Sequence, residues 1–307
     1  MIIYIPRHNG GAGKWIYEGY FNAWEFIGKV EEYEVKYYDN ISEIDTESSY
    51  SLMATEGGIN RNPISLLEKV LSNAVKVFMY VQPHTFPEPW GRHPNFVTNA
   101  SDDFVALVNS LDNIKLWSFS KTKNVPYWDK WKDVAYIPLA FDNIGYDFVP
   151  NDKFKYDVCY IGGFANNGFD EKFKIMNEYF TELSYQGISV EGIHVNKNVS
   201  LEHEYHILSN SKICLNIHDK YQQELGLDCN ERTFKSLGLN GCLVSDKVDC
   251  LSDLEGLMIM EADSPKHMAE IIKEYLDKDL SIIKNLNKSV VLDNHTYCNR
   301  VRSLLCL

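Results

Sequence analysis

A short polar cluster at the start of an amphipathic segment is the part of the sequence best suited to bind a charged ligand. The cluster runs from Asn230 through Glu231, Arg232 and Thr233 to Lys235, and the helical pattern that it opens ends at a glycine before a short β-rich segment. The first turn of a helix has unpaired backbone N–H groups and carries the positive end of the helix dipole, so phosphates and other anions are stabilised there. An arginine adds a planar fork that can bind two oxygens at once. The pattern therefore predicts a site for a phosphate-bearing ligand.

Two glycines and a histidine follow strand-like segments in the same half of the chain. Gly162 and Gly163 come directly after the apolar run Asp157–Ile161, and His218 follows the run Lys212–Ile217. Glycine lets the backbone approach a ligand closely, as in phosphate-binding turns, although an ordinary tight turn explains these glycines when they are considered alone. Because open α/β sheets bind ligands at the carboxyl ends of their strands, we expect these residues to lie near the polar cluster.

Three side chains in the first half are placed to act as general bases. His8, Glu56 and His84 each follow an apolar, strand-like run, so in a parallel sheet they reach the same carboxyl edge. A carboxylate or an imidazole at that edge could deprotonate the hydroxyl group of an acceptor. For each residue taken singly, a hydrogen-bonded structural role is the stronger interpretation.

Several common sites are excluded by residue spacing. The segment Asn9–Trp15 lacks the first glycine and the hydroxyl residue of a phosphate-binding P-loop. The segment His203–His206 does not have the HExxH spacing of a zinc protease, and Asp246–Asp249 does not have the spacing of an Asp-x-Asp metal motif. We therefore expect neither a metal ion nor a cofactor.

Composition limits the class of protein further. The 307 residues include 30 basic and 43 acidic ones, and the resulting negative charge argues against a protein that holds long nucleic acid by counterion release. Seven cysteines without any CxxC pair predict reduced thiols in the core. No apolar run approaches the roughly 20 residues that span a bilayer, and the amino-terminal residues have the pattern of a strand rather than of a signal peptide. We expect a soluble, cytoplasmic protein.

Strand-like and helix-like segments alternate along the chain, which predicts parallel, doubly wound sheets. A polar, proline-containing stretch near residue 150 interrupts the alternation, and the pattern then restarts without a repeat of sequence. We therefore expect an α/β fold of two Rossmann-like domains, residues 1–150 and 151–307, facing each other across a central cleft. The expected strands are Ile2–Ile5, Glu34–Tyr38, Ser51–Thr55, Lys76–Val81, Asp157–Ile161, Ser189–His194, Lys212–Ile217 and Cys242–Ser245. The expected helices begin at Trp15, at Asn62-Pro63 with Ile64 inward, after Ser101, at Asp170 with Phe173 inward, after Ser200, at the polar cluster and at Ser264-Pro265.

Four segments resemble parts of the CgeB-like, spore-maturation-type glycosyltransferases, mostly their carboxy-terminal domain. The similar segments are Ile137–Asp142, Asp157–Gly162, Asn230–Gly241 and His295–Arg300, and the resemblance extends over roughly residues 136–305. The first half is similar only in general pattern. The resemblance implies the GT-B architecture and a hexosyltransferase-type glycosyltransferase, whose donor is a nucleotide diphosphate-sugar, usually a uridine diphosphate (UDP) sugar.

The resemblance also implies roles for individual residues. Gly162 would lie near the diphosphate of the donor, and Asn230 with Arg232 would contact phosphate or sugar. Lys235 stands where relatives commonly carry a glutamate that holds the ribose hydroxyl groups. We therefore expect either that Lys235 contacts phosphate or that Glu231 supplies the carboxylate. Enzymes of this architecture generally stabilise the departing diphosphate without a metal ion. The expected donor-binding residues are Gly162, Gly163, His218, Asn230, Glu231, Arg232, Thr233 and Lys235.

Three functions are compatible with the sequence. The first is a glycosyltransferase that acts on a glycan, a small molecule or a protein. The second is a transferase that modifies bases in DNA, against which the net charge of −13 argues. The third is a non-catalytic nucleotide- or sugar-binding protein that has kept the fold, for which Lys235 in place of the glutamate is the best indication. Slow hydrolysis of the donor separates the first two functions from the third.

Overall fold

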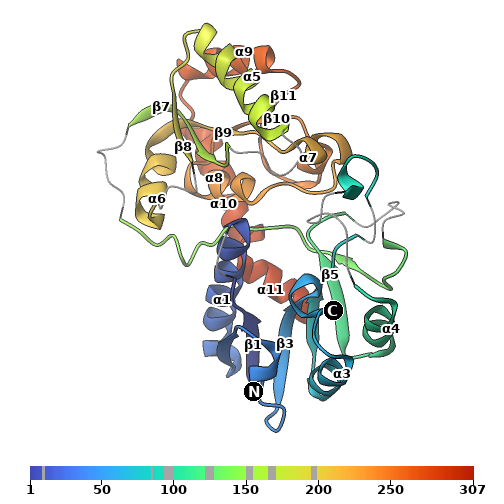
Figure 1. Ribbon diagram of the computed structural model, residues 1–307. Helices are drawn as coiled ribbons and strands as arrows, with labels where there is room; N and C mark the ends of the chain where they lie inside the picture. Colours follow the sequence, from blue (N-terminus) through green and yellow to red (C-terminus); the bar gives the residue numbers. More distant parts are fainter. Residues whose placement is uncertain are drawn as a thin grey trace. The chain divides into compact units, whose positions relative to one another are not determined.

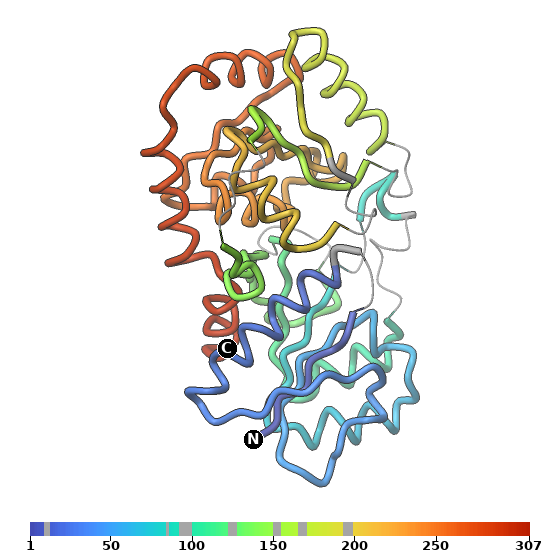
Figure 2. The backbone as a smooth tube through the Cα atoms, turned by 90° about the vertical axis from the view of Figure 1, so that its left-hand side faces the viewer, coloured from blue at the N-terminus to red at the C-terminus, as the bar shows by residue number. Residues whose placement is uncertain are grey.

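The computed structural model describes residues 1–8, 11–83, 86–92, 100–121, 128–149, 155–164, 171–194 and 199–307 (Figure 1). The chain forms two compact units. The first comprises Met1–Pro138 together with Arg300–Leu307, and the second comprises Leu139–Asn299. Both chain termini therefore lie in the first unit, as Figure 2 also shows.

The division between the units differs from the expected boundary near residue 150. Phe141 forms an isolated parallel bridge with Thr296, and its backbone N–H donates to the carbonyl of His295 at 2.8 Å. These bonds attach the segment after Pro138 to the second unit. The chain returns to the first unit at Arg300. The Nε of Arg300 donates a hydrogen bond to the carbonyl of Pro138 at 2.8 Å.

The first unit is built on a six-stranded parallel sheet with the strand order β2-β1-β3-β4-β5-β6. Helices α3 and α4 cover one face, where Leu67 and Phe104 are fully buried, and α1 covers the other, where the ring of Trp24 packs on Phe78 at a centroid distance of 5.7 Å (Figure 1). The strands are β1 (Ile2–Pro6), β2 (Glu34–Tyr38), β3 (Tyr50–Thr55), β4 (Val77–Tyr80), β5 (Ile114–Ser118) and β6 (Ala135–Tyr136). The helices are α1 (Gly11–Glu31), η1 (Ile41–Glu43), α2 (Glu56–Ile59), α3 (Ile64–Asn73), η2 (Trp90–Arg92) and α4 (Asp102–Ser110), and most of α11 (Tyr297–Leu305) belongs here as well.

The second unit is built on a five-stranded parallel sheet with the order β11-β10-β9-β7-β8. Helices α5 and α9 pack on one face, with Met176, Leu183, Met268 and Ile272 in the core, and α8 packs against α6 and α10. The strands are β7 (Tyr156–Gly162), β8 (Val190–His194), β9 (Ser211–Asn216), β10 (Leu243–Asp246) and β11 (Met260–Ala262). The helices are α5 (Glu171–Tyr185), α6 (Leu201–Asn210), α7 (Lys220–Leu225), α8 (Glu231–Leu239), η4 (Asp249–Asp253), α9 (Pro265–Leu276) and α10 (Ser281–Asn294).

Both sheets have a topological switch point. The first strand of each unit, β1 or β7, lies between the second strand on one side and the third on the other. The connections that leave such a strand pass to opposite faces of the sheet, so a crevice opens at the carboxyl ends of the two diverging strands. Ligands are therefore expected to bind at the carboxyl ends of β1 and β3 and at those of β7 and β9.

The doubly wound α/β fold was predicted correctly, but two helices differ in detail from the prediction. Asn62 does not cap α3. Pro63 occupies the cap position, with φ −55° and ψ 137°, and the helix starts after it, which leaves Ile64 41% exposed. Phe173, expected to face inward, is 54% exposed. The neighbouring Lys172 is buried in its place, with its amine bonded to the carbonyl of Ile217.

Gly241, which connects α8 to β10, requires its glycine for two reasons. Its φ of +85° is unfavourable for other residues, and an added Cβ would lie 2.6 Å from the Cα of Lys284. Gly241→Ala is therefore expected to lower the free energy of unfolding by about 3 kcal/mol, as the sum of backbone strain and overpacking. Gly187→Ala is the matched control, because φ is +75° there but no atom lies within 4 Å of the added Cβ, and it should cost about 1 kcal/mol. Urea denaturation of both variants measures the difference, and equal losses would contradict the steric argument.

Candidate functional site

Arg232 lies at the switch point of the second sheet. It occupies the first turn of α8, whose cap residue Asn230 accepts a hydrogen bond from the backbone N–H of Thr233 at 3.2 Å. The Nε of Arg232 donates to the carbonyl of Ile161 in β7 at 2.6 Å. Its Nη1 donates to the Oδ1 of Asn216, the last residue of β9, at 2.9 Å. One guanidinium thus joins the carboxyl ends of the two diverging strands.

The end of β7 is shaped to receive this guanidinium. The Cζ of Arg232 lies 4.6 Å from the centre of the Tyr160 ring, a distance at which a cation is attracted to the ring face. A Cβ added at Gly162 would lie 2.6 Å from the Cζ of Arg232 and 2.6 Å from the hydroxyl oxygen of Tyr160. Gly162 therefore leaves the space that the arginine fills, whereas a Cβ at Gly163 would meet no atom within 4 Å.

Part of the positive charge at this edge has no partner among the described residues. The Nη2 of Arg232 has no hydrogen-bond partner among the described residues, and none of the described carboxylates forms an ion pair with its guanidinium. The backbone N–H groups of Glu231 and Arg232 likewise have no hydrogen-bond acceptor among the described residues. A half-buried guanidinium beside the open first turn of a helix is suited to bind a phosphate or a diphosphate.

Thr233 and Lys235 lie inside the protein rather than at this open edge. Thr233 is fully buried and its hydroxyl accepts a hydrogen bond from Asn216 at 2.9 Å. Lys235 is 4% exposed, and its amine forms ion pairs with Glu204 at 2.6 Å and Glu231 at 3.4 Å. Burial by itself lowers the pKa of Lys235, but the two carboxylates outweigh it and raise that pKa above its ordinary value. The cation of Lys235 is thus already balanced within the fold.

Glu231 lies between the buried Lys235–Glu204 ion pair and the open edge. Burial raises the pKa of its carboxyl group, and Lys235 and Arg232 oppose the effect only in part. Its neighbour in the cluster, Glu204, also accepts a hydrogen bond from the hydroxyl of Tyr146 at 2.6 Å. The carboxylate of Glu231, which was expected to take the ribose-binding role if Lys235 did not contact phosphate, is paired with Lys235 in this structure.

His218 is fully buried and does not reach the open edge. Its Nδ1 lies 2.7 Å from the Oδ1 of Asp246, and its Nε2 lies 3.3 Å from the amide nitrogen of Asn216. Neither Asp246 nor Asn216 was noticed in the sequence as part of the site. The pattern contains a usable signal, because both residues end strands of the parallel sheet.

Lys172 is a further residue that sequence reasoning missed. Its buried amine donates to the carbonyl of Ile217 at 3.0 Å and forms an ion pair with Asp219 at 2.9 Å. The Nη1 of Arg232 reaches the same Ile217 carbonyl at 3.2 Å. Two cations thus fix the chain just after β9, and only the lysine is neutralised by a carboxylate.

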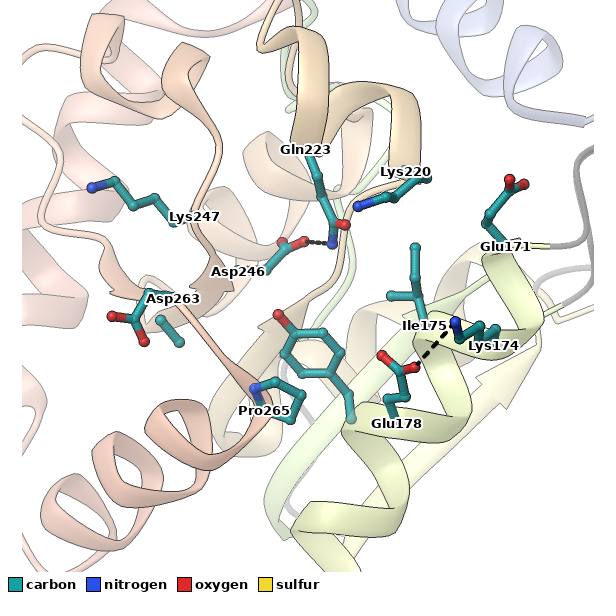
Figure 3. Close-up of a pocket in the computed structure, with 12 residues that line it drawn as sticks. Glu171, Lys174, Ile175, Glu178, Lys220, Gln223, Asp246, Lys247, Asp263 and Pro265 are labelled. Carbon is teal, nitrogen blue, oxygen red and sulfur yellow. Dashed lines mark hydrogen bonds and ion pairs between the residues drawn. The ribbon is translucent and has the colours of Figure 1, made fainter. Parts of the chain in front are cut away.

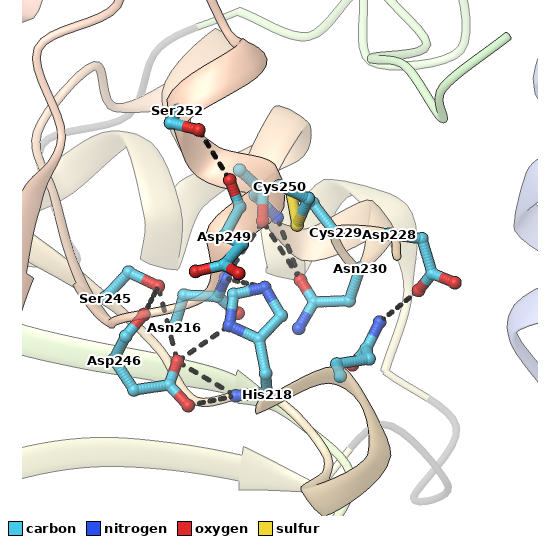
Figure 4. The surroundings of a disulfide bond; sticks show 12 residues. Asn216, His218, Asp228, Cys229, Asn230, Ser245, Asp246, Asp249, Cys250 and Ser252 are labelled. Atoms are coloured by element: carbon cyan, nitrogen blue, oxygen red, sulfur yellow. Dashed lines mark hydrogen bonds and ion pairs between the residues drawn. A yellow bond between two sulfur atoms is a disulfide. The ribbon is translucent and has the colours of Figure 1, made fainter. Parts of the chain in front are cut away.

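A disulfide adjoins the cap of α8 and corrects the expectation of reduced cysteines. Cys229 and Cys250 are bonded, with their Cα atoms 5.9 Å apart (Figure 4). The remaining thiols, those of Cys159, Cys214, Cys242, Cys298 and Cys306, are free. The bond joins residues 21 positions apart, a separation that a search for CxxC pairs does not detect. It ties the residue before Asn230 to η4.

A polar pocket of about 310 Å³ lies at the carboxyl ends of β10 and β11 (Figure 3). Gln223 donates to the Oδ2 of Asp246 at 2.7 Å at its inner end. Charged groups of both signs line it, so it offers partners to the hydroxyl groups of a sugar or a ribose. The lining residues are Glu171, Lys174, Ile175, Glu178, Tyr179, Lys220, Gln223, Asp246, Lys247, Ala262, Asp263 and Pro265.

The first unit has a larger pocket at its own switch point. Its volume is about 580 Å³, and it lies where β1 and β3 end. Five aromatic side chains of the described residues contribute to its walls, including a stacked pair formed by Tyr80 and Phe119 with centroids 4.8 Å apart. Sequence reasoning did not identify these rings as a group, because they come from separate strands and from α1. The lining includes Arg7, His8, Tyr17, Tyr38, Asp39, Gly57, Gly58, Tyr80, Gln82, Trp117 and Phe119.

The three predicted bases have different positions. His8 is exposed, lines this pocket and stacks on Tyr17 with ring centroids 5.8 Å apart. Glu56 is only 1% exposed, and its Oε1 accepts a hydrogen bond from Asn60 at 2.7 Å. His84 lies outside the described residues. Of the described candidates, His8 is therefore the one that borders the pocket.

The described residues contain no group of three or more His, Cys, Asp or Glu side chains arranged to hold a metal ion. Within the same residues, no helix combines the length and apolar character needed to cross a bilayer.

Two parallel-sheet units, each with a switch-point edge, define the GT-B fold, and solved structures support this assignment. T4 phage β-glucosyltransferase is 12% identical, with a TM-score of 0.56 over 99% of this chain and 97% of that one. AviGT4, a glycosyltransferase involved in avilamycin A biosynthesis, is 10% identical, with a TM-score of 0.54 over 99% and 95%. The T4 phage enzyme in complex with its UDP-glucose substrate is 11% identical, with a TM-score of 0.52 over 99% and 97%.

The family comparison agrees with the fold. Residues 163–306, just under half of the chain, match the family described as glycosyl transferase-like. No curated protein is significantly similar in sequence. The GT-B fold expected from the sequence is confirmed, while the CgeB-like resemblance stays a prediction within it.

The contact between Gly162 and Arg232 can be tested with inorganic pyrophosphate. Gly162→Ala is expected to weaken pyrophosphate binding about tenfold, because the new methyl group displaces the guanidinium and its charge-assisted hydrogen bonds. Gly163→Ala is the control, since a Cβ there meets no atom within 4 Å. Isothermal titration calorimetry measures both affinities. If the two variants bound pyrophosphate equally well, the diphosphate would not depend on the position of Arg232.

Proposed function

We propose that the protein is a glycosyltransferase that moves a sugar, a hexose, from a UDP-sugar to an acceptor hydroxyl group. The observation that carries this proposal is the guanidinium of Arg232, which is held across the β7–β9 switch point with one nitrogen uncommitted among the described residues. The match of residues 163–306 to a glycosyl transferase-like family supports it. So does the likeness in fold to a structure with UDP-glucose as its named substrate.

The donor is proposed to bind with its diphosphate at Arg232 and at the first turn of α8. The acceptor oxygen forms a bond to the anomeric carbon as the bond from that carbon to the diphosphate oxygen breaks, so UDP leaves with the electron pair. Negative charge grows on the diphosphate during this step. A fixed guanidinium and oriented N–H groups stabilise such a charge without a metal ion. Asn230 contributes by holding the helix start in place through Thr233.

The acceptor is proposed to bind in the aromatic pocket of the first unit. Its volume of about 580 Å³ lies in the usual range for small-molecule sites, and sugars stack well on aromatic faces. His8 borders this pocket and is the proposed base that accepts the proton of the acceptor hydroxyl. Glu56 and His84 stay alternative candidates, although the carboxylate of Glu56 is already bonded to Asn60.

Two other functions make different experimental predictions. A transferase for modified bases in DNA would bind DNA by its phosphates, so its affinity for DNA would fall steeply with salt. The T4 phage enzyme is a phage glucosyltransferase of the same fold, which keeps this alternative in consideration. A non-catalytic relic of the fold would bind UDP but would not cleave any UDP-sugar.

The donor site is tested first by thermal shift with a panel of nucleotides and nucleotide sugars. At 100 times its dissociation constant, UDP or a UDP-sugar should stabilise the protein by about 2.7 kcal/mol. Arg232→Ala should weaken nucleotide binding and so reduce this shift. Arg302→Ala removes one exposed charge from α11 and is the matched control, for which the shift should persist. If no nucleotide shifted the wild type, or if both variants retained the shift, the proposed donor site would be wrong.

Catalysis is tested by the release of UDP from UDP-glucose in water. A transferase should turn over the donor slowly without an acceptor, and His8→Gln should slow this release by about 10²-fold or more, as loss of a general base does. Its affinity for UDP should stay unchanged because the proposed UDP site, at Arg232 and the first turn of α8, does not include His8. Coupled spectrophotometric detection of UDP measures the rate. Binding of UDP with no release from any UDP-sugar would favour the non-catalytic alternative.

A further inference from the structure

Behind Arg232 lies a line of buried polar side chains that links three elements of the second unit. It runs from Asp246 at the end of β10 through His218 to Asn216 at the end of β9, and from there to Arg232 in α8. We propose that His218 is a positioning residue that orients the amide of Asn216 and thereby holds the guanidinium of Arg232 in its diphosphate-binding position. This inference rests on the proposed function and assigns His218 a role behind the ligand rather than in contact with it.

The hydrogen-bonding atoms along the line lie 2.7 to 3.3 Å apart, and the three residues behind Arg232 are buried. The Nδ1 of His218 lies 2.7 Å from Asp246, its Nε2 lies 3.3 Å from the Nδ2 of Asn216, and the Oδ1 of Asn216 lies 2.9 Å from the Nη1 of Arg232. Asn216 and His218 are fully buried and Asp246 is 2% exposed. Figure 4 shows the carboxylate of Asp246 hydrogen-bonded to His218, with Asn216 nearby. Because no water competes for these groups, the hydrogen bonds determine how each side chain is turned.

The direction of every hydrogen bond follows from the arginine. A guanidinium only donates, so the atom of Asn216 that faces Arg232 must be the oxygen. The amide nitrogen then faces the hydroxyl of Thr233 at 2.9 Å and the ring of His218. Since that nitrogen donates, the Nε2 of His218 must accept, and the ring proton must be on Nδ1. This tautomer donates to the carboxylate of Asp246, which completes the line without a clash of like groups.

Asp246 is a firm anchor for this tautomer. Its carboxylate also accepts from the backbone N–H of His218 at 3.0 Å and from the side chain of Gln223 at 2.7 Å. Burial alone would raise the pKa of Asp246, but His218 and Gln223 hold that pKa below its ordinary value. The carboxylate is therefore charged and fixed, and it selects the Nδ1–H form of the imidazole.

The consequence for Arg232 concerns the choice between two orientations of Asn216. If the amide turned over, its NH₂ group would face the guanidinium, and a donor would oppose a donor. An acceptor at the position of the His218 Nε2 makes the productive orientation the favoured one. The other contacts of Arg232, to Ile161 and Ile217, are with backbone carbonyls that cannot turn in this way. Asn216 is therefore the contact of Arg232 whose orientation can change, and His218 fixes that orientation.

Two substitutions at residue 218 separate this role from simple filling of space. The carboxamide of glutamine reaches the position of Nε2 and can accept from Asn216. That of asparagine reaches only the position of Nδ1, so it can donate to Asp246 but offers Asn216 no acceptor. We expect His218→Asn to raise the dissociation constant for UDP about tenfold, and His218→Gln to recover most of that loss. His206→Asn, which removes another buried histidine of the same unit, should leave UDP affinity unchanged.

A mutant cycle measured by isothermal titration calorimetry with UDP tests whether His218 acts through Arg232. Combined with Arg232→Ala, His218→Asn should cause no further loss of affinity, because the residue that it positions is gone. Asn216→Ala should reproduce the tenfold loss, and it replaces His218→Asn if that variant does not fold by circular dichroism. Equal affinities of the glutamine and asparagine variants, or additive losses in the cycle, would overturn the positioning role. If Arg232→Ala alone did not weaken UDP binding, the proposed donor site itself would fail.

Discussion

The bonds from the guanidinium of Arg232 to the ends of β7 and β9 are the interaction on which the rest of the site depends. Parallel strands that diverge at a switch point leave carbonyl groups facing a crevice, and one arginine satisfies several of them at once. Tyr160 supplies the surface below it, and Gly162 leaves the space for it. The first turn of α8 is set by the same contact, since Arg232 belongs to that turn. Chain positions far apart in sequence are thus brought together by a single planar cation.

The cations near this edge are balanced in different ways, and the difference decides which of them can serve a ligand. Lys172 and Lys235 are buried and each is matched by a carboxylate. Burying an unmatched ammonium would cost several kcal/mol, so these two have little freedom to bind anything else. Arg232 is held by neutral oxygens, which fix its position and leave its charge uncompensated by any described ion pair. Lys235 is thus committed to Glu204 and Glu231 inside the second unit.

Much of the fold could be predicted from the sequence because its strands are continuous apolar runs, which a parallel sheet buries on both faces. The edge of the sheet at which each run ends was also predictable, which is why Gly162 and Arg232 were expected to lie near each other, as they do. The direction of a side chain at that edge was not. His218 and Lys235 point into the protein because Asp246 and Glu204, distant in sequence, receive them there. A single sequence does not pair residues across elements, so neither partner could be foreseen, and the disulfide of Cys229 escaped notice for the same reason.

The return of the chain at Arg300 has a consequence for how this protein is assembled. Because Arg300–Leu307 belong to the first unit, the second unit is an uninterrupted insertion within a discontinuous host. The carbonyl of Leu305 accepts a hydrogen bond from Lys76 at 3.4 Å, so the first unit acquires α11 only after Arg300–Leu307 have been made. During synthesis the inserted unit is therefore complete before the host that was begun first, which reverses the order in which the two halves appear in the sequence.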